Sequence, residues 1–193
     1  MEKLKKLAII FLWITIAWNT FEGISAIILG LQAHSLALFA YGLESSIEIF
    51  ASIVVLMELR GFFSRKLEEK HALQAIGVAY VFVSGYIAFQ AISNFLAHKT
   101  ADTSPLGVLL MIVTVFMMGG LGITKHILGK KLKSATVMAD AKFTLIDGML
   151  SFSVLIGLLI QFILPWWWLD HALALFLAAA ALKEGVEELR IKN

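Results

Sequence analysis

Long apolar stretches alternate with short charged ones along the 193 residues of this chain. Six of the apolar stretches can cross a bilayer, which takes about 20 helical residues. We place them near 7–30, 35–59, 72–97, 106–128, 135–163 and 166–189. No alternating strand pattern interrupts them, and lipid admits only helices or closed barrels. The pattern therefore predicts an all-α membrane protein, a single domain of six transmembrane helices covering residues 1–193.

The composition fits this class and excludes others. Hydrophobic residues make up 60% of the chain, and the formal net charge is only +2, so we expect a lipid bilayer and no nucleic acid as partner. The chain has no cysteine, so any metal must be held by oxygen or imidazole. We find no nucleophile–base pair, phosphate-binding loop or haem motif. We therefore expect neither an enzyme nor a resident cofactor.

Positive charge is distributed unevenly between the connections. The N-terminus, the second and fourth connections and the C-terminus hold nearly all of the lysines and arginines, whereas the other three connections hold Lys99 alone. The fourth connection is assigned Lys125, Lys130, Lys131 and Lys133. Positive residues are retained on the cytoplasmic side. We therefore expect both termini in the cytoplasm and the protein in the cytoplasmic membrane.

Two of the predicted helices repeat one another at an offset of 99 residues. The matched positions are Ser35 with Ser134, Ala40 with Ala139, Glu48 with Asp147 and Ser52 with Ser151. The repeat relates the second helix to the fifth, which is the middle helix of each half. Because each half has three helices, the two halves insert in opposite directions. This 3+3 inverted repeat is typical of secondary transporters that bind cargo near the midplane.

Three acids lie at mid-depth in these two helices. Glu44 and Glu48 are four residues apart and share one helix face, while Asp147 comes from the other half. At 1.5 Å per residue, Glu48 and Asp147 lie roughly 18–20 Å from the starts of their helices. Charge inside hydrocarbon costs at least ~2.5–3.5 kcal/mol per group and usually marks function. We therefore predict a divalent-cation site at these acids, with protons competing for the same oxygens.

Five further residues are candidates for auxiliary roles at the cation site: Asp140, Asn19, Tyr41, Thr144 and Glu22. Asn19 also fits an interhelical hydrogen bond, and Glu22 fits either such a bond or a proton path.

Other polar residues have two interpretations each. Lys142, one turn into the fifth helix, either snorkels to the inner interface or neutralises Asp140 or a site acid. Asp170 and His171 either form an outer metal site or mark a helix cap. His71, with Glu68 and Glu69 nearby, either forms a cytoplasmic entry site or lies in a solvated inner loop, and we favour the loop.

The second and fifth helices resemble the transmembrane domain of the cation diffusion facilitator family. The second helix of that family typically reads Ser-x-Ala-Leu-x-Ala-Asp-x-x-His-Ser-x-x-Asp, and residues 35–48 follow this frame. Its fifth helix typically reads Ala-Asp-Ala-x-His-x-x-x-Asp, and residues 139–147 follow that one. The resemblance implies a homodimeric antiporter that exports a divalent metal cation in exchange for protons.

The chain departs from the family pattern at one implied ligand. The four ligand positions implied by the resemblance fall on Glu44, Glu48, Phe143 and Asp147, and the phenyl ring cannot ligate. The remaining oxygen ligands favour hard cations such as Mn²⁺, Fe²⁺ or Mg²⁺, while Zn²⁺ and Co²⁺ stay open. We also expect the family's cytoplasmic C-terminal domain to be missing, because the chain stops ten residues after Lys183.

Two other functions remain open beside cation efflux. Phe143 and Tyr41 favour a non-transporting membrane protein of the same fold, such as a sensor or an assembly subunit. Carboxylates beside aromatic rings also suit an organic-cation transporter.

Overall fold

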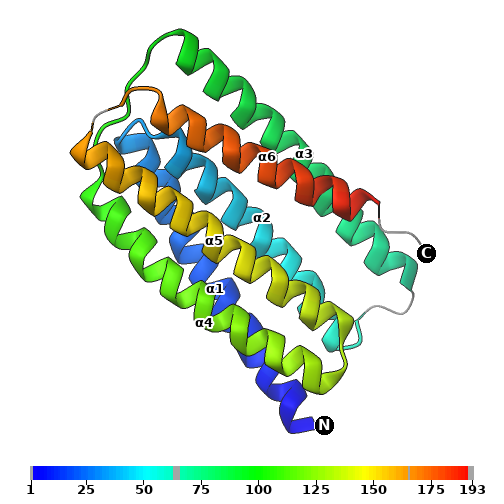
Figure 1. The fold of residues 1–193 in the computed structure, drawn as a ribbon. Helices are drawn as coiled ribbons and strands as arrows, with labels where there is room; N and C mark the ends of the chain where they lie inside the picture. The colour runs from blue at the N-terminus through cyan, green and yellow to red at the C-terminus, as the bar shows by residue number, and fades with distance from the viewer. Residues whose placement is uncertain (1, 63–65, 165, 191–193) are drawn as a thin grey trace.

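Six α-helices lie side by side in one elongated bundle (Figure 1). The computed structural model describes residues 2–62, 66–164 and 166–190. The helices are α1 (Glu2–Gln32), α2 (Leu36–Leu59), α3 (Lys66–Leu96), α4 (Pro105–Leu132), α5 (Ala135–Ile163) and α6 (Leu169–Leu189). Within the described residues all regular secondary structure is helical, which confirms the prediction of an all-α protein with six helices.

Five of the described helices are long and apolar enough to cross a membrane: α1, α2, α4, and the segments Gln74–Leu96 of α3 and Val137–Ile163 of α5. The apolar run of α6 is shorter, since it lies between Asp170 and Lys183, and its crossing stays a prediction. Large apolar side chains cover the outside of the bundle. Phe82, Phe116 and Ile163 are among the most exposed of them, as contact with lipid allows.

Some helices continue beyond the apolar stretches. Helix α3 begins at Lys66, so His71 is an exposed residue of a helix and the prediction of a loop there is wrong. Helix α4 runs on to Leu132 and includes Lys125. A change in hydropathy marks where apolar surroundings end, whereas a helix ends where its hydrogen bonds end. The two limits therefore differ by several residues.

The hairpins α1–α2 and α4–α5 are built on the same turn. A residue in the left-handed conformation follows each first helix, His34 (φ 50°) after α1 and Lys133 (φ 51°) after α4, and the two lie one repeat apart in the sequence. The amide of the following serine, Ser35 or Ser134, bonds the carbonyl oxygen five residues earlier at 2.9 Å and 3.1 Å. Both serine hydroxyls then cap the next helix. The sequence repeat therefore corresponds to a repeated structure.

Glycines set the spacing within each hairpin. A Cβ atom at Gly30 would lie 2.6 Å from the amide nitrogen of Phe39, and one at Gly129 would lie 3.0 Å from that of Met138. Such contacts leave no room for a side chain, so the two helix backbones meet directly. The two hairpins run in opposite directions along the bundle (Figure 1). Their insertion in opposite directions across a membrane stays a prediction.

The bundle has two ends, which we name by the two serines. The Ser35 end holds the α1–α2, α3–α4 and α5–α6 turns, and the Ser134 end holds the other two turns together with the start of α1 and the end of α6 (Figure 1). The largest apolar cluster draws on all six helices and lies toward the Ser35 end. A smaller one lies toward the Ser134 end: Leu12, Ile16, Val55, Leu56 and Val137. Polar residues are buried between the two clusters along α1, α2 and α5.

Candidate functional site

Four buried carboxylates lie between the two apolar clusters, and we call them the acid cluster: Glu22, Glu44, Glu48 and Asp147. Their residues are 0%, 3%, 5% and 0% exposed, in that order. Helix α1 provides the first, α2 the next two and α5 the last. Asp147 interacts electrostatically with each of the three glutamates. The structure thus places the three candidate ligands Glu44, Glu48 and Asp147 in one buried cluster and adds Glu22 to them.

The repeat fixes the depth of the acid cluster. Glu48 lies 12 residues after Leu36, where α2 begins, and Asp147 lies 12 residues after Ala135, where α5 begins. At 1.5 Å per residue, each is about 18 Å from the start of its helix. Because these helices start at opposite ends of the bundle (Figure 1), the two acids meet near its middle.

Hydroxyl groups surround Glu22. The Tyr41 hydroxyl donates to one carboxylate oxygen at 3.2 Å, and Thr114 of α4 donates to the other at 2.8 Å. The Ser45 hydroxyl lies 3.4 Å from the first oxygen. Tyr41, a candidate auxiliary ligand, therefore contacts the acid cluster through Glu22.

The other acids are less fully bonded. The Asn19 side chain donates to Glu48 at 3.1 Å. One oxygen of Glu44 and both oxygens of Asp147 accept no hydrogen bond of ordinary geometry within the described parts of the chain, although Tyr41 and Glu22 are close enough to interact with Asp147. A buried carboxylate oxygen without a partner costs free energy. These oxygens are therefore suited to take up a proton or a cation.

The acid cluster is not a finished coordination shell. In the residues that the structure describes, no three Asp, Glu or His side chains are arranged closely enough to hold a metal ion as they stand. Phe143 is half-buried on α5 and offers no donor atom. Like charges repel, so bare carboxylates separate from one another. Binding a cation would require these carboxylates to move closer together.

Lys125 is buried inside the bundle, and its assignment to the fourth connection is wrong. Its side chain is 0% exposed, and its Nζ lies 2.6 Å from Asp140 Oδ2 and 2.5 Å from Thr144 Oγ1. Ser52 of α2 donates to the other oxygen of Asp140 at 2.9 Å. Two of the auxiliary candidates, Asp140 and Thr144, therefore bind a lysine. Hydropathy missed Lys125 because a lysine near a helix end usually reaches water.

Lys142 lies on the outside of the bundle. Its side chain is 60% exposed, and its Nζ lies 3.5 Å from Glu187 Oε2 of α6. This position matches the snorkelling interpretation. The cation that neutralises Asp140 is Lys125 and not Lys142.

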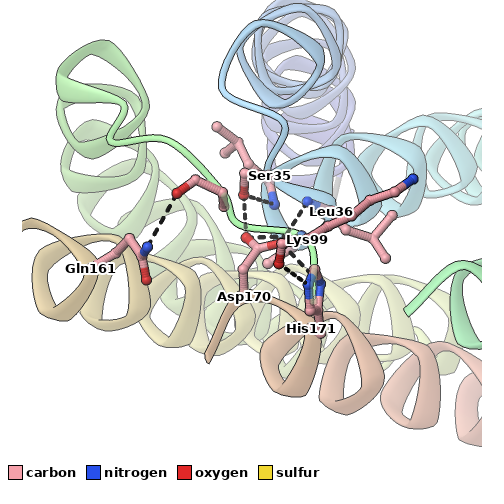
Figure 2. A network of polar contacts seen from close by, with 9 residues as sticks. Ser35, Leu36, Lys99, Gln161, Asp170 and His171 are labelled. Atoms are coloured by element: carbon pink, nitrogen blue, oxygen red, sulfur yellow. Dashed lines mark hydrogen bonds and ion pairs between the residues drawn. The ribbon is translucent and has the colours of Figure 1, made fainter. Parts of the chain in front are cut away.

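Asp170 caps a helix other than its own. It lies in the first turn of α6, and its carboxylate accepts from the Ser35 hydroxyl at 2.5 Å and from the Leu36 amide at 2.7 Å, at the start of α2 (Figure 2). His171 lies 2.8 Å from the carbonyl oxygen of Lys99 (Figure 2). These bonds tie α6 to α2 and to the α3–α4 connection. They favour the cap over the outer metal site.

Comparison with known proteins points to one family. Residues 74–192 match the family model described as the cation efflux transmembrane domain. The chain is 25% identical over 166 residues to the uncharacterized transporter sll1263 of Synechocystis sp., covering 81% of this chain and 53% of that protein. It is 24% identical over 156 residues to the magnetosome protein MamB of Magnetospira sp., covering 76% and 52%. The chain thus spans about half the length of these curated relatives.

Proposed function

This chain belongs to the cation efflux family, and from that premise we propose that it exports a divalent metal cation from the cell in exchange for protons. The chain is a multi-pass membrane protein. We further propose that it works in the cytoplasmic membrane as a homodimer. Glu44, Glu48 and Asp147 would bind the cation.

The observation that carries this proposal is the set of unpartnered oxygens on Glu44 and Asp147. Burying them in an apolar bundle is costly, and a protein with no use for them gains stability by losing them. A divalent cation bound by three carboxylates leaves a net charge near −1. Protons on the same oxygens provide the alternative neutral state when the cation leaves. Either occupant satisfies the same groups, which is the chemical basis for exchange.

Alternating access would expose this site to one side of the membrane at a time. The acid cluster lies between two apolar clusters, one toward each end of the bundle. Opening one cluster while the other stays packed would give the cation a path to one side only. The glycine contacts within each hairpin support movement of a hairpin as one unit.

The decisive experiment is cation-driven proton movement in sealed proteoliposomes. Mn²⁺ and Zn²⁺ are tested side by side on the wild type, on Asp147→Asn and on Asp102→Asn. Asp102 is an exposed acid beside His34 at the Ser35 end, so it undergoes the same chemical change outside the acid cluster. We expect saturable proton flux in the wild type and in Asp102→Asn, and none in Asp147→Asn.

Each outcome has one meaning. Stronger flux with Mn²⁺ than with Zn²⁺ would support the hard-ligand argument. Equal flux in Asp147→Asn would show that the acid cluster is not the transport site. If neither metal moves protons in well-sealed vesicles, the transporter proposal fails for these ions, and Phe143 would mark a site converted to sensing or assembly.

An organic cation is the second candidate cargo. A cavity of about 540 Å³ lies between α4, α5 and α6, and its lining includes Phe152, Phe176 and Glu184. Aromatic rings beside a carboxylate suit an organic cation. Competition between tetramethylammonium and Mn²⁺ for the wild type separates the two cargoes. Loss of Mn²⁺ binding when tetramethylammonium is added would favour the organic cation, and Mn²⁺ binding that tetramethylammonium leaves unchanged would favour the metal.

A further inference from the structure

We propose that Lys125 determines the affinity of the cation site by holding Asp140 away from the acid cluster. Lys125 then limits the protein to a set of acids that binds its cargo loosely enough to release it. This inference rests on the function proposed above, and it assigns Lys125 a role that neither the family match nor the repeat assigns.

The packing of α4 against α5 encloses Lys125. Gly122 and Gly129 lie on the same face of α4, one turn before and one turn after it. A Cβ atom at Gly122 would lie 2.7 Å from the side chain of Leu145, and one at Gly129 would lie 2.7 Å from that of Met138. The two helices therefore meet directly on both sides of the lysine. No space is left through which its ammonium group reaches water.

The partners of Lys125 hold Asp140 on both of its oxygens. The ammonium group lies 2.6 Å from one oxygen, and the Ser52 hydroxyl donates to the other at 2.9 Å. Thr144 accepts from the same ammonium group at 2.5 Å and donates to the backbone carbonyl of Asp140 at 3.1 Å. An ion pair and a hydrogen bond therefore occupy the two oxygens of the Asp140 carboxylate.

Asp140 is otherwise well placed to join the site. Asp140, Thr144 and Asp147 are spaced at i, i+4 and i+7 along α5, so they lie on one face of the helix. Lys125 also interacts electrostatically with Glu48 and Asp147. The lysine is thus close enough to act on the acid cluster as well as on Asp140. Removing its charge would leave Asp140 as an additional oxygen ligand.

A transporter must release its cargo, so very tight binding at the cation site would slow transport. A cation held by too many carboxylates would be released slowly, and conduction requires sites that bind well enough to fill and loosely enough to empty. A built-in ammonium group reduces the negative charge available to the cargo without removing an acid. It also repels a divalent cation more strongly than a monovalent one.

The test is Mn²⁺ binding to the purified protein in nanodiscs, followed by the electron paramagnetic resonance signal of free Mn²⁺. We expect Lys125→Gln to bind Mn²⁺ about tenfold more tightly than the wild type, because a charge is removed and an oxygen ligand is freed. The matched control is Lys142→Gln, which removes an exposed lysine from α5. Its affinity should equal that of the wild type.

The double variant Lys125→Gln/Asp140→Asn tests the role of Asp140. We expect its affinity to return close to that of the wild type, because the freed ligand is gone. The single variant Asp140→Asn should bind Mn²⁺ about tenfold more weakly than the wild type. It removes the carboxylate that pairs with Lys125, so the ammonium charge acts on the acid cluster without compensation. This variant keeps the inference testable if Lys125→Gln does not fold. A double variant that still binds Mn²⁺ about tenfold more tightly than the wild type would show that Asp140 is not the freed ligand. A double variant that binds as weakly as Asp140→Asn would show that Asp140 already ligates the cation in the wild type. Either result would overturn the inference.

Two kinds of failure are distinguishable. If the wild type binds Mn²⁺, Asp147→Asn abolishes binding and both Lys125→Gln and Asp140→Asn bind like the wild type, the inference about Lys125 is wrong and the proposed function stands. If the wild type binds no Mn²⁺, or Asp147→Asn binds it unchanged, the proposed function fails, and this inference fails with it.

Discussion

The hairpins α1–α2 and α4–α5 share a backbone but differ in their buried charges. Both turn through a left-handed residue, both cap the second helix with a serine, and both bring their helices together at glycines one repeat apart. In the first hairpin, α1 presents Glu22 to hydroxyl groups of α2. In the second, α4 presents Lys125 to a carboxylate and a hydroxyl of α5.

This difference separates the role of the repeat from the role of its exceptions. The glycines and caps set where the helices lie, and they recur because both hairpins need the same spacing. The charged residues Glu22 and Lys125 do not match across the repeat, because residues 121 and 26 are Leu and Ala. The repeat therefore explains the shared backbone of the two hairpins. The unmatched residues differ in kind: the first hairpin buries an additional acid, Glu22, and the second buries a base, Lys125.

Breaking the ion pair in the second hairpin should have the largest effect on stability. Lys125→Met leaves Asp140 buried without its cation, and we expect the free energy of unfolding to fall by about 3–5 kcal/mol. Denaturant unfolding in mixed micelles measures this. Lys142→Met removes an exposed partner and should cost no more than about 1 kcal/mol. Equal losses in the two variants would mean that the buried ion pair between Lys125 and Asp140 stabilises the fold no more than an exposed lysine does.

Adding a methyl group at the hairpin glycines should have the next largest effect, and it should be similar in both hairpins. Gly30→Ala and Gly129→Ala place a Cβ against a neighbouring backbone, and each should cost about 1–3 kcal/mol of unfolding free energy. The controls are Gly85→Ala and Gly119→Ala, which have open space around the new atom. These should raise stability by about 0.5–1 kcal/mol. If Gly30→Ala kept the stability of the wild type while Gly129→Ala lost stability, the two hairpins would not be packed in the same way.

Weakening the cap from Asp170 should affect the first hairpin alone. Asp170→Asn keeps an oxygen but loses the negative charge that accepts from the start of α2, at a cost of about 1 kcal/mol. Hydrogen exchange at the amides of Leu36 and Ala37 should become faster, while that of Val137 in α5 stays as it was. Asp102→Asn serves as the exposed control. Faster exchange at both helix starts would indicate general loosening instead of a lost cap.

Neutralising Glu22 should change stability least. In Glu22→Gln the amide oxygen still accepts from Tyr41 or Thr114, and the loss of charge-assisted bonds opposes the relief of repulsion with Asp147. We expect a change below about 1 kcal/mol in the free energy of unfolding. Mn²⁺ affinity should nevertheless fall, because the acid cluster loses one charge. Unchanged Mn²⁺ affinity would show that the charge of Glu22 does not contribute to cation binding.

Hydropathy and repetition predicted much of this architecture. The apolar stretches gave the six helices to within a few residues at most ends, and the offset of 99 residues placed Glu48 and Asp147 at equal depth. The conformation of a helix hairpin depends on local residues, so a local repeat carries that information. The ligand role of the acids is not tested by the fold and stays a prediction.

Contacts between distant helices could not be predicted in the same way. The charge pattern assigns Lys125 to a connection because its burial depends on α5 packing against α4, which a single helix does not reveal. The cap from Asp170 joins residues 135 apart in the sequence and depends on where α6 begins. The sequence contained one clue: a lysine flanked by glycines at helical spacing, in place of an apolar residue.

The cap on α2 has a consequence for the order in which the protein is synthesised. Helix α2 leaves the ribosome before α6, yet the carboxylate that binds the amides of Leu36 and Ala37 belongs to α6. Until Asp170 has been translated, those two amides must bond to water or to lipid head groups. The start of α2 is therefore completed only when α6 inserts. If synthesis stops before Asp170, the first amides of α2 lack their carboxylate partner.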